Sequence, residues 1–237
     1  MKQALIRRFS LTERLAHWVN ALGFLTCLAT GTVMAFKARI GITQDALAII
    51  RNVHLTGASV FVLGPMIVWL TGRTGEMFRW IRDALRWTWS DIVWLLCPLF
   101  RAVRWSVRIP AADRFNAGQK INVAGMFVIK WTAAATGLVM WRGHGWLAAH
   151  QVHLLAFLLA FPLLGGHLFM AVLNPRTNHS LRGMIGGWVR EDWARHHHGR
   201  WIEREGQRIE RRTVDTRPPA ATGSTGAEMP AADPVKG

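Results

Sequence analysis

The sequence predicts an all-α membrane protein built as a bundle of four transmembrane helices. Apolar residues make up 51% of the 237 residues although the net charge is +15, so charged connections must separate apolar stretches. Four such stretches are long enough to cross a hydrocarbon layer about 30 Å thick, which takes about 20 helical residues. The basic residues lie mostly on one side of these stretches, an asymmetry typical of membrane topology.

The four predicted spans are residues 16–36, 53–70, 121–141 and 146–173. The first two contain no charged side chain, and the third contains only Lys130. The fourth contains no Asp, Glu, Lys or Arg but carries three histidines. The two cysteines, Cys27 and Cys97, are too few for a disulfide framework.

The distribution of Lys and Arg predicts the orientation. The N-terminus, the connection 71–120 and the tail 174–237 hold 24 of the 29 basic residues, whereas the opposite face holds 4. Because basic loops stay on the cytoplasmic side, both termini are expected to be cytoplasmic. The positive charge is then a topology signal that also attracts anionic lipid, and nucleic acid is not an expected partner.

The segments outside the spans differ in composition. The run from Ile92 to Phe100 is apolar but too short to cross, and tryptophans flank it among arginines, a pattern typical of interfacial helices. Such helices are expected between spans two and three and after span four. An integral-membrane domain is expected over residues 1–212. Small and polar residues dominate afterwards, so residues 213–237 are expected to be a disordered cytoplasmic tail. No internal repeat is apparent.

Four histidines inside the spans are candidate functional residues, because an imidazole in a bilayer is costly unless a partner satisfies it. Span one enters from the inner face, whereas spans two and four enter from the outer face. His17 and His167 are therefore expected to meet near the inner face. His54 and His153 are expected to meet near the outer face. His153 and His167 lie on one helix, about 21 Å apart along it and nearly on one side.

Two histidine pairs at two depths are what bis-imidazole ligation of two stacked haems requires. The chain has no Cys-x-x-Cys-His run, which excludes covalent c-type haem attachment. His150 is the competing outer ligand, but its direction differs from that of His167 by about 100°, so the common side is lost. The alternative is that the histidines only hydrogen-bond helices together, which explains four of them at paired depths poorly.

Other polar and small residues have less direct interpretations. Lys130 lies deep in its span, so a carbonyl, carboxylate or propionate partner or a water-filled pocket is expected. The run His196 to His198 lies among arginines and is expected to be solvated or to face headgroups, with metal binding as the alternative. Close helix packing or a flat macrocycle would each explain the glycines near the ligands, namely Gly31, Gly57, Gly137, Gly165 and Gly166.

Five runs lie in order at the ends of the spans: RRFSLTERLAHW, RNVHLTG, RFNAGQKIN, GHLFMAVLNP and SLRGMIGGWVREDWARHHHGRW. Together they resemble the gamma subunit of bacterial respiratory formate dehydrogenase, a membrane di-haem cytochrome b. The resemblance covers about residues 7–202. In that family the haem ligands lie on the first, second and fourth helices, with two on the fourth. By position this implies His17, His54, His153 and His167, in agreement with the depth argument.

The resemblance also implies a quinone pocket beside the cytoplasmic-side haem. It would be formed by His167 together with the segment before the third span, which here consists of Asn116, Ala117, Gly118 and Gln119. An amide side chain and free backbone groups can hydrogen-bond a carbonyl of menaquinone or ubiquinone. Without the resemblance, residues 116–118 are more typical of a helix cap.

The implied activity is an electron relay. A catalytic alpha subunit with a molybdenum or tungsten pterin oxidises formate outside, and an iron–sulfur beta subunit passes electrons to the outer haem, from which they reach the inner haem and quinone. The chain itself is expected to carry no catalytic residue and to hold and tune its cofactors. Two alternatives stay open: a di-haem cytochrome b of a hydrogenase or thiosulfate reductase, and a haem-free membrane anchor.

Overall fold

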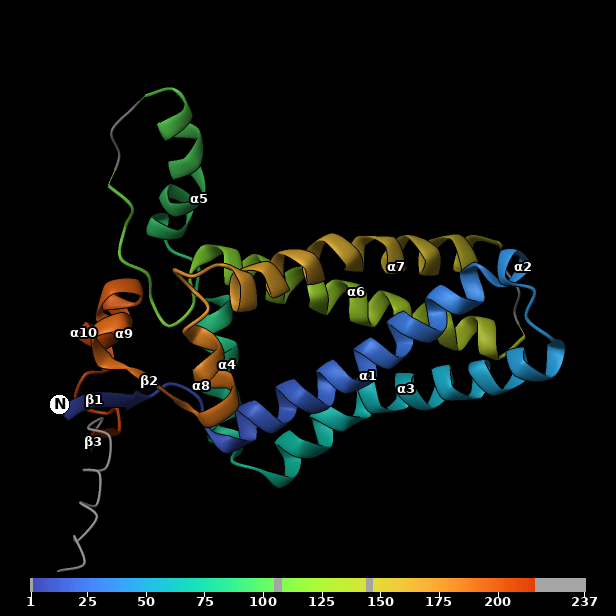
Figure 1. Ribbon diagram of the computed structural model, residues 1–237, viewed down its shortest axis with the longest axis horizontal. Coiled ribbons are helices and arrows are strands. Elements are labelled where there is room, and N and C mark those ends of the chain that lie inside the picture. Colours follow the sequence, from blue (N-terminus) through green and yellow to red (C-terminus); the bar gives the residue numbers. More distant parts are fainter. Residues whose placement is uncertain (1, 105–107, 144–146, 216–237) are drawn as a thin grey trace, which may run out of the picture.

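A computed structural model describes residues 2–104, 108–143 and 147–215 (Figure 1). Within these residues, four helices are long and apolar enough to cross a membrane. They are α1 (Leu11–Ala35), α3 (Gln44–Thr71), α6 (Ala117–Trp141) and α7 (Leu147–Leu168), the last continued by a π-helical turn, Phe169–Leu173. The predicted fold class, all-α with four apolar helices of membrane-spanning length, is confirmed.

Three of these helices begin earlier than the predicted spans because polar caps start them outside the apolar stretch. Ser10, Thr43 and Asn116 each accept a hydrogen bond from a backbone N–H in the first turn of α1, α3 and α6. Hydropathy locates the hydrocarbon-facing part of a helix and not its polar first turn. The fourth predicted span ends at Leu173, where the π-helical turn ends, and its first residue, Trp146, lies outside the described residues.

The four long helices form two antiparallel pairs, α1 with α3 and α6 with α7 (Figure 1). Contacts within each pair are extensive, whereas α3 and α6 touch little. Gly23 allows the close crossing of α1 and α3, since a Cβ there would lie 2.4 Å from the backbone nitrogen of Phe61. The pairs meet near their middles in a buried cluster formed by Phe24, Phe61, Ile129, Ala156 and Ala160.

Helices α1 and α6 share one local design, which hydropathy alone does not reveal. Each helix has 25 residues, begins with a capping box and is preceded by Arg-Phe, and equivalent residues lie 106 positions apart. Arg8 donates to the carbonyl of Arg114 at 3.2 Å, and Arg114 donates to the carbonyl of Arg8 at 2.8 Å. These reciprocal bonds join the segments that precede α1 and α6.

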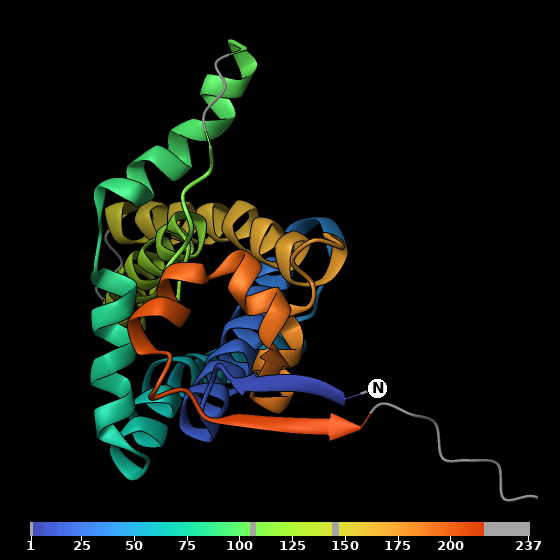
Figure 2. The ribbon, with the colours of Figure 1, turned by 90° about the vertical axis from the view of Figure 1, so that its left-hand side faces the viewer.

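The remaining elements gather at one end of the bundle, the capped end (Figures 1 and 2). The opposite end, the far end, carries the short helix α2 (Lys37–Ile40). The cap contains three strands in the order β2-β1-β3, with antiparallel pairing. Its elements are β1 (Lys2–Arg7), α4 (Thr74–Leu85), α5 (Trp89–Ala102), α8 (Ser180–Gly186), β2 (Trp188–Arg190), α9 (Glu191–His197), α10 (Gly199–Glu205) and β3 (Arg211–Asp215).

The small sheet pairs the first strand of the chain with two strands near its other end, and it was not predicted. Ile6 of β1 pairs with Val189 of β2 and with Arg211 of β3. Ile6 and Val189 are fully buried in an apolar cluster with Trp201 and Ile202 of α10. Strand β3 runs to Asp215, so the predicted domain boundary between residues 212 and 213 falls inside a strand. The rest of the predicted tail, residues 216–237, lies outside the described residues.

Buried ion pairs tie the cap to the starts of the long helices. Arg114 Nη2 lies 2.7 Å from Glu13 Oε1, and both side chains are nearly inaccessible. Arg114 Nη1 also lies 3.7 Å from Asp83 Oδ2 of α4. Lys120 Nζ lies 2.9 Å from Asp91 Oδ2 of α5. Buried ion pairs therefore fix the starts of α1 and α6 at the capped end.

Candidate functional site

Two pairs of histidines face each other between the helix pairs, on either side of the central apolar cluster. The inner pair consists of His17 of α1 and His167 of α7, whose ring centroids lie 6.1 Å apart near the capped end. The outer pair consists of His54 of α3 and His153 of α7, whose ring centroids lie 6.3 Å apart toward the far end. The structure thus brings together the histidines that the depth argument pairs.

The spacing within each pair fits one metal ion between two imidazoles. With metal–imidazole bonds of about 2 Å, two rings on opposite sides of one ion have centroids about 6 Å apart. Direct stacking of the rings would bring them closer, and a hydrogen bond between ring nitrogens is not formed by either pair among the described contacts. Both pairs therefore have the geometry that bis-imidazole ligation of a haem iron needs.

The glycines beside the histidines divide into two groups. A Cβ on Gly137 would lie 3.4 Å from His153 Cε1, and a Cβ on Gly31 would lie 3.7 Å from His54 Cε1. On Gly165 and Gly166, next to His167, a Cβ would meet open space. Gly57 instead packs against Thr26 of α1, at 2.7 Å from Cβ to Cγ2, and serves helix packing. The other four glycines therefore leave the imidazoles and their surroundings free of side-chain bulk.

Hydroxyl groups lie against the outer pair, and sequence reasoning missed them. His54 Nδ1 is 2.8 Å from Thr30 Oγ1, and His153 Nδ1 is 3.0 Å from Thr136 Oγ1. Both threonines precede a glycine at equivalent positions of α1 and α6, so the repeated Ala-Thr-Gly sequence was the signal available. His150, the competing outer candidate, is exposed on α7, and it is His153 that faces His54.

Lys130 finds a partner on the neighbouring helix pair. Its Nζ donates to Asn20 Oδ1 at 2.9 Å and lies 4.7 Å from the centre of the Phe61 ring. An amide carbonyl is one of the partners expected for this lysine. Asn20 lies one turn after His17, and Phe61 belongs to the central cluster, so the ammonium lies between the levels of the two histidine pairs.

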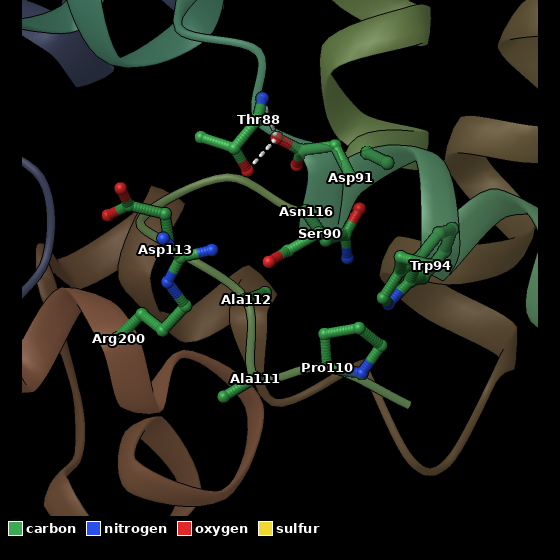
Figure 3. Close-up of a pocket in the computed structure, with 11 residues that line it drawn as sticks. Thr88, Ser90, Asp91, Trp94, Pro110, Ala111, Ala112, Asp113, Asn116 and Arg200 are labelled. Atoms are coloured by element: carbon green, nitrogen blue, oxygen red, sulfur yellow. Dashed lines mark hydrogen bonds between the residues drawn. The ribbon is translucent and has the colours of Figure 1, made fainter. Parts of the chain in front are cut away.

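The predicted quinone segment forms the start of α6. Asn116 Oδ1 accepts from the backbone N–H of Gln119 at 2.8 Å, and Gln119 Oε1 accepts from the N–H of Asn116 at 3.0 Å, which is a capping box. A Cβ on Gly118 would lie 3.4 Å from the Trp94 ring of α5. Asn116 and Ala117 line a small hollow beside Trp94, Asp113 and Arg200 (Figure 3). The described residues that line this hollow do not include His167.

The run His196 to His198 is not a uniformly solvated segment, which corrects the expectation. His198 is 2% exposed, and its Nδ1 lies 2.7 Å from the carbonyl oxygen of Asp113. His197 stacks on Trp193, whereas His196 is exposed. Burial, with the nearby charge of Arg8, holds the pKa of His198 well below 6.5. Among the described residues, no group of three or more His, Cys, Asp or Glu side chains is placed to hold a metal ion.

Known proteins resemble this chain over most of its length. Residues 8–187 match the family model described as prokaryotic cytochrome b561. The formate dehydrogenase cytochrome b556 subunit of Haemophilus influenzae is 27% identical over 222 residues, covering 84% of this chain and 83% of that protein. The formate dehydrogenase cytochrome b556(fdo) subunit of Escherichia coli K12 is 22% identical, covering 83% and 91%. The nitrate-inducible b556(Fdn) subunit of the same organism is 24% identical, covering 84% and 91%.

These matches confirm the resemblance to the formate dehydrogenase cytochrome b subunit, and they span both histidine pairs. The family model begins at Arg8, just before the cap of α1, and ends at Gly187, just before β2. It therefore covers all four long helices and leaves out the whole three-stranded sheet. The chain belongs to the prokaryotic cytochrome b561 family.

Proposed function

We propose that this chain is the membrane cytochrome b subunit of a formate dehydrogenase complex and relays electrons through two b haems to membrane quinone. The observation that carries the proposal is the pair of facing imidazoles at each of two levels, 6.1 Å and 6.3 Å apart between ring centroids. The relatives are subunits of formate dehydrogenases, which supports the choice of this complex.

The residues of this chain hold and insulate the cofactors. The outer pair would ligate one haem and the inner pair the other, and bound haem supplies reversible one-electron chemistry. Helix α7 contributes a ligand to each pair, so it fixes the separation of the two levels at about 21 Å along its axis. The central apolar cluster keeps water away from the space between the levels.

Orientation follows from the positive charge of the capped end. If the basic segments face the cytoplasmic side of a bacterial inner membrane, both termini are cytoplasmic and the inner pair lies near the cytoplasmic face. Electrons would enter at the outer pair from an iron–sulfur beta subunit, fed by a pterin-containing alpha subunit that oxidises formate. Helix α5, with Trp89 and Leu99 exposed, extends across the direction of the spans and would lie in the membrane interface (Figure 1).

Quinone would bind at the capped end, where protons can come from the cytoplasm. The proposed contacts are Asn116 and Gly118, together with His167. The capping box uses Oδ1 of Asn116, and the side-chain NH₂ has no hydrogen-bond partner among the described residues, so it is free to donate to a quinone carbonyl. This amide lies beside Trp94 of α5, at the edge of a small hollow between α5 and the start of α6.

The test is an optical spectrum of the purified, haem-loaded membrane protein with matched histidine variants. Reduced b-type bands that correspond to about two haems per chain are expected. His153→Ala should remove one haem and leave the other, because only the outer pair loses a ligand. His150→Ala, on the same helix and one turn away, should keep both haems. Two haems retained in His153→Ala, or no haem in the unaltered protein, would overturn the proposal.

A further inference from the structure

The two ligands of the outer pair contact the same kind of group. His54 of α3 approaches Thr30 of α1, and His153 of α7 approaches Thr136 of α6, in each case through Nδ1. Each threonine lies on the helix that forms a pair with the helix of its histidine. Because Thr30 and Thr136 occupy equivalent positions in the repeated helices, the two contacts are copies of one arrangement.

The direction of the proton in these contacts follows from the hydroxyl groups. Thr30 Oγ1 donates to the carbonyl of Thr26 at 2.6 Å, and Thr136 Oγ1 donates to the carbonyl of Thr132 at 2.7 Å. A hydroxyl has one proton to donate, so a threonine that gives it to the helix carbonyl accepts from its histidine. We assign the proton of both imidazoles to Nδ1 on this basis. Nε2 of both histidines is left with its lone pair, as iron ligation requires.

Glycines complete the arrangement. Gly31 and Gly137 follow the two threonines, and a Cβ at either position would come within 3.7 Å of the Cε1 atom that lies between the two ring nitrogens. The ring edge can thus lie against the helix while Nδ1 reaches the hydroxyl. Among the described residues, the ring nitrogens of His17 and His167 have no hydrogen-bond acceptor of this kind. The two levels therefore differ in how their imidazoles are held.

We propose that Thr30 and Thr136 are positioning residues that lower the reduction potential of the outer haem. This rests on the proposed function, in which His54 and His153 ligate that haem. A ligand imidazole that donates its Nδ1 proton to an acceptor becomes a stronger electron donor through Nε2, which favours the oxidised iron. The inner pair lacks these acceptors, so the difference in potential would direct electrons from the outer level to the inner one.

The experiment is a potentiometric titration of the purified, haem-loaded complex, followed by optical and electron paramagnetic resonance spectra. Thr30→Val and Thr136→Val keep the side-chain shape and remove the hydroxyl. Each should raise the midpoint potential of the outer haem, the two together should raise it further, and the inner haem should not move. Thr30→Ser and Thr136→Ser restore the hydroxyl and should return the potential toward that of the unaltered protein.

Thr32→Val is the matched control. Thr32 Oγ1 donates to the carbonyl of Leu28 at 2.7 Å, the same intrahelical bond, but no hydrogen bond joins it to a histidine in the described residues. It should leave both potentials unchanged. Loss of the outer haem in the valine variants with recovery in the serine variants also supports the positioning role. The proposal is overturned if both valine variants keep the outer haem at its original potential, or if serine fails as valine does.

Failure of the proposed function gives a different result. If His153→Ala leaves two haems in place, the ligand assignment is wrong, whatever the threonine variants do. If His153→Ala removes the outer haem and the valine variants leave its potential unaltered, the assignment stands and only the role of the threonines is rejected. The haem that disappears in His153→Ala also identifies which midpoint belongs to the outer level.

Discussion

At the residue scale, the sequence predicts best the partners of single polar side chains inside the spans. A polar side chain in hydrocarbon needs a partner on another helix, and depth alone restricts the choice. This is why the pairs His17 with His167 and His54 with His153 could be predicted from topology and a helical rise of about 1.5 Å per residue. Depth gives no direction around a helix, so Asn20 could not be named as the partner of Lys130.

The bond between Lys130 and Asn20 gives a prediction for stability. Asn20→Leu leaves the ammonium without its 2.9 Å acceptor, and the free energy of unfolding should fall by about 1.5–3 kcal/mol, the usual range for a bond to a charged group. Lys130→Met removes the charge that needs the acceptor. The double variant should therefore be more stable than Asn20→Leu alone, as measured by denaturant unfolding in detergent. Additive losses from the two substitutions would contradict this account.

The threonines that contact the outer histidines show a second limit at the residue scale. Thr30 and Thr136 are uncharged, and other threonines lie in the same spans. Each hydroxyl also has an acceptor in its own helix, as that of Thr32 does, so nothing in composition distinguishes them from Thr32. They become distinctive only when the two helices are compared position by position. The Asn116 cap shows the opposite case, since residue types alone predicted it and the capping box confirms it.

At the element scale, the two helix pairs start from one buried joint. Arg114 before α6 binds Glu13 in the first turn of α1. The side chains of Arg114 and Arg8 also each donate to the other's backbone carbonyl. The paired starts hold α1 and α6 in a fixed relation, while their later turns diverge enough to leave room between the pairs for ligand histidines. Hydropathy predicted each helix separately, but the joint depends on an ion pair between residues 101 positions apart.

Breaking this joint should be costly. Arg114→Met leaves the Glu13 carboxylate buried and unpaired, and the loss in unfolding free energy should be about 3–5 kcal/mol. Arg73→Met serves as the control, because Arg73 is 80% exposed in its ion pair with Glu76 and the change should be within about 1 kcal/mol. Thermal unfolding in detergent compares them. Equal effects of the two substitutions would show that the joint is not buried.

At the scale of the whole molecule, the capped end combines segments from all along the chain. Strand β1 at the start pairs with β3 near the end of the described residues, and His198 after α9 binds the carbonyl of Asp113 before α6. The three-stranded sheet could not be predicted because its strands are short and its partners lie far apart in sequence. Counting basic residues predicted that the termini share one side, and both strands do lie at one end of the bundle (Figure 2).

The buried His198 makes the cap sensitive to acid. Burial holds its folded pKa well below 6.5, the value of a free imidazole. Above pH 6.5 the ring is neutral in both states, whereas below it the unfolded chain binds a proton that the folded cap does not accept. Stability should therefore fall as the pH decreases from about 6.5 toward the folded pKa. Hydrogen exchange of amides in α9 and α10 at a series of pH values measures this loss.

His198→Asn provides the comparison for the acid effect. An asparagine side-chain N–H can donate to the Asp113 carbonyl in place of Nδ1, but it does not titrate. Protection of the cap amides in this variant should depend less on pH between 6.5 and 5. An identical pH profile in both proteins would show that other groups in the cap cause the effect.

The most direct test of the central claim is a cryo-electron microscopy map of the intact membrane complex, in which the ligands of any bound haem are visible. We expect two flat macrocycles between the helix pairs, one with His17 and His167 as axial ligands and the other with His54 and His153. A map with no macrocycle between these side chains, or with iron ligated by His150 or by residues of the cap, would contradict it.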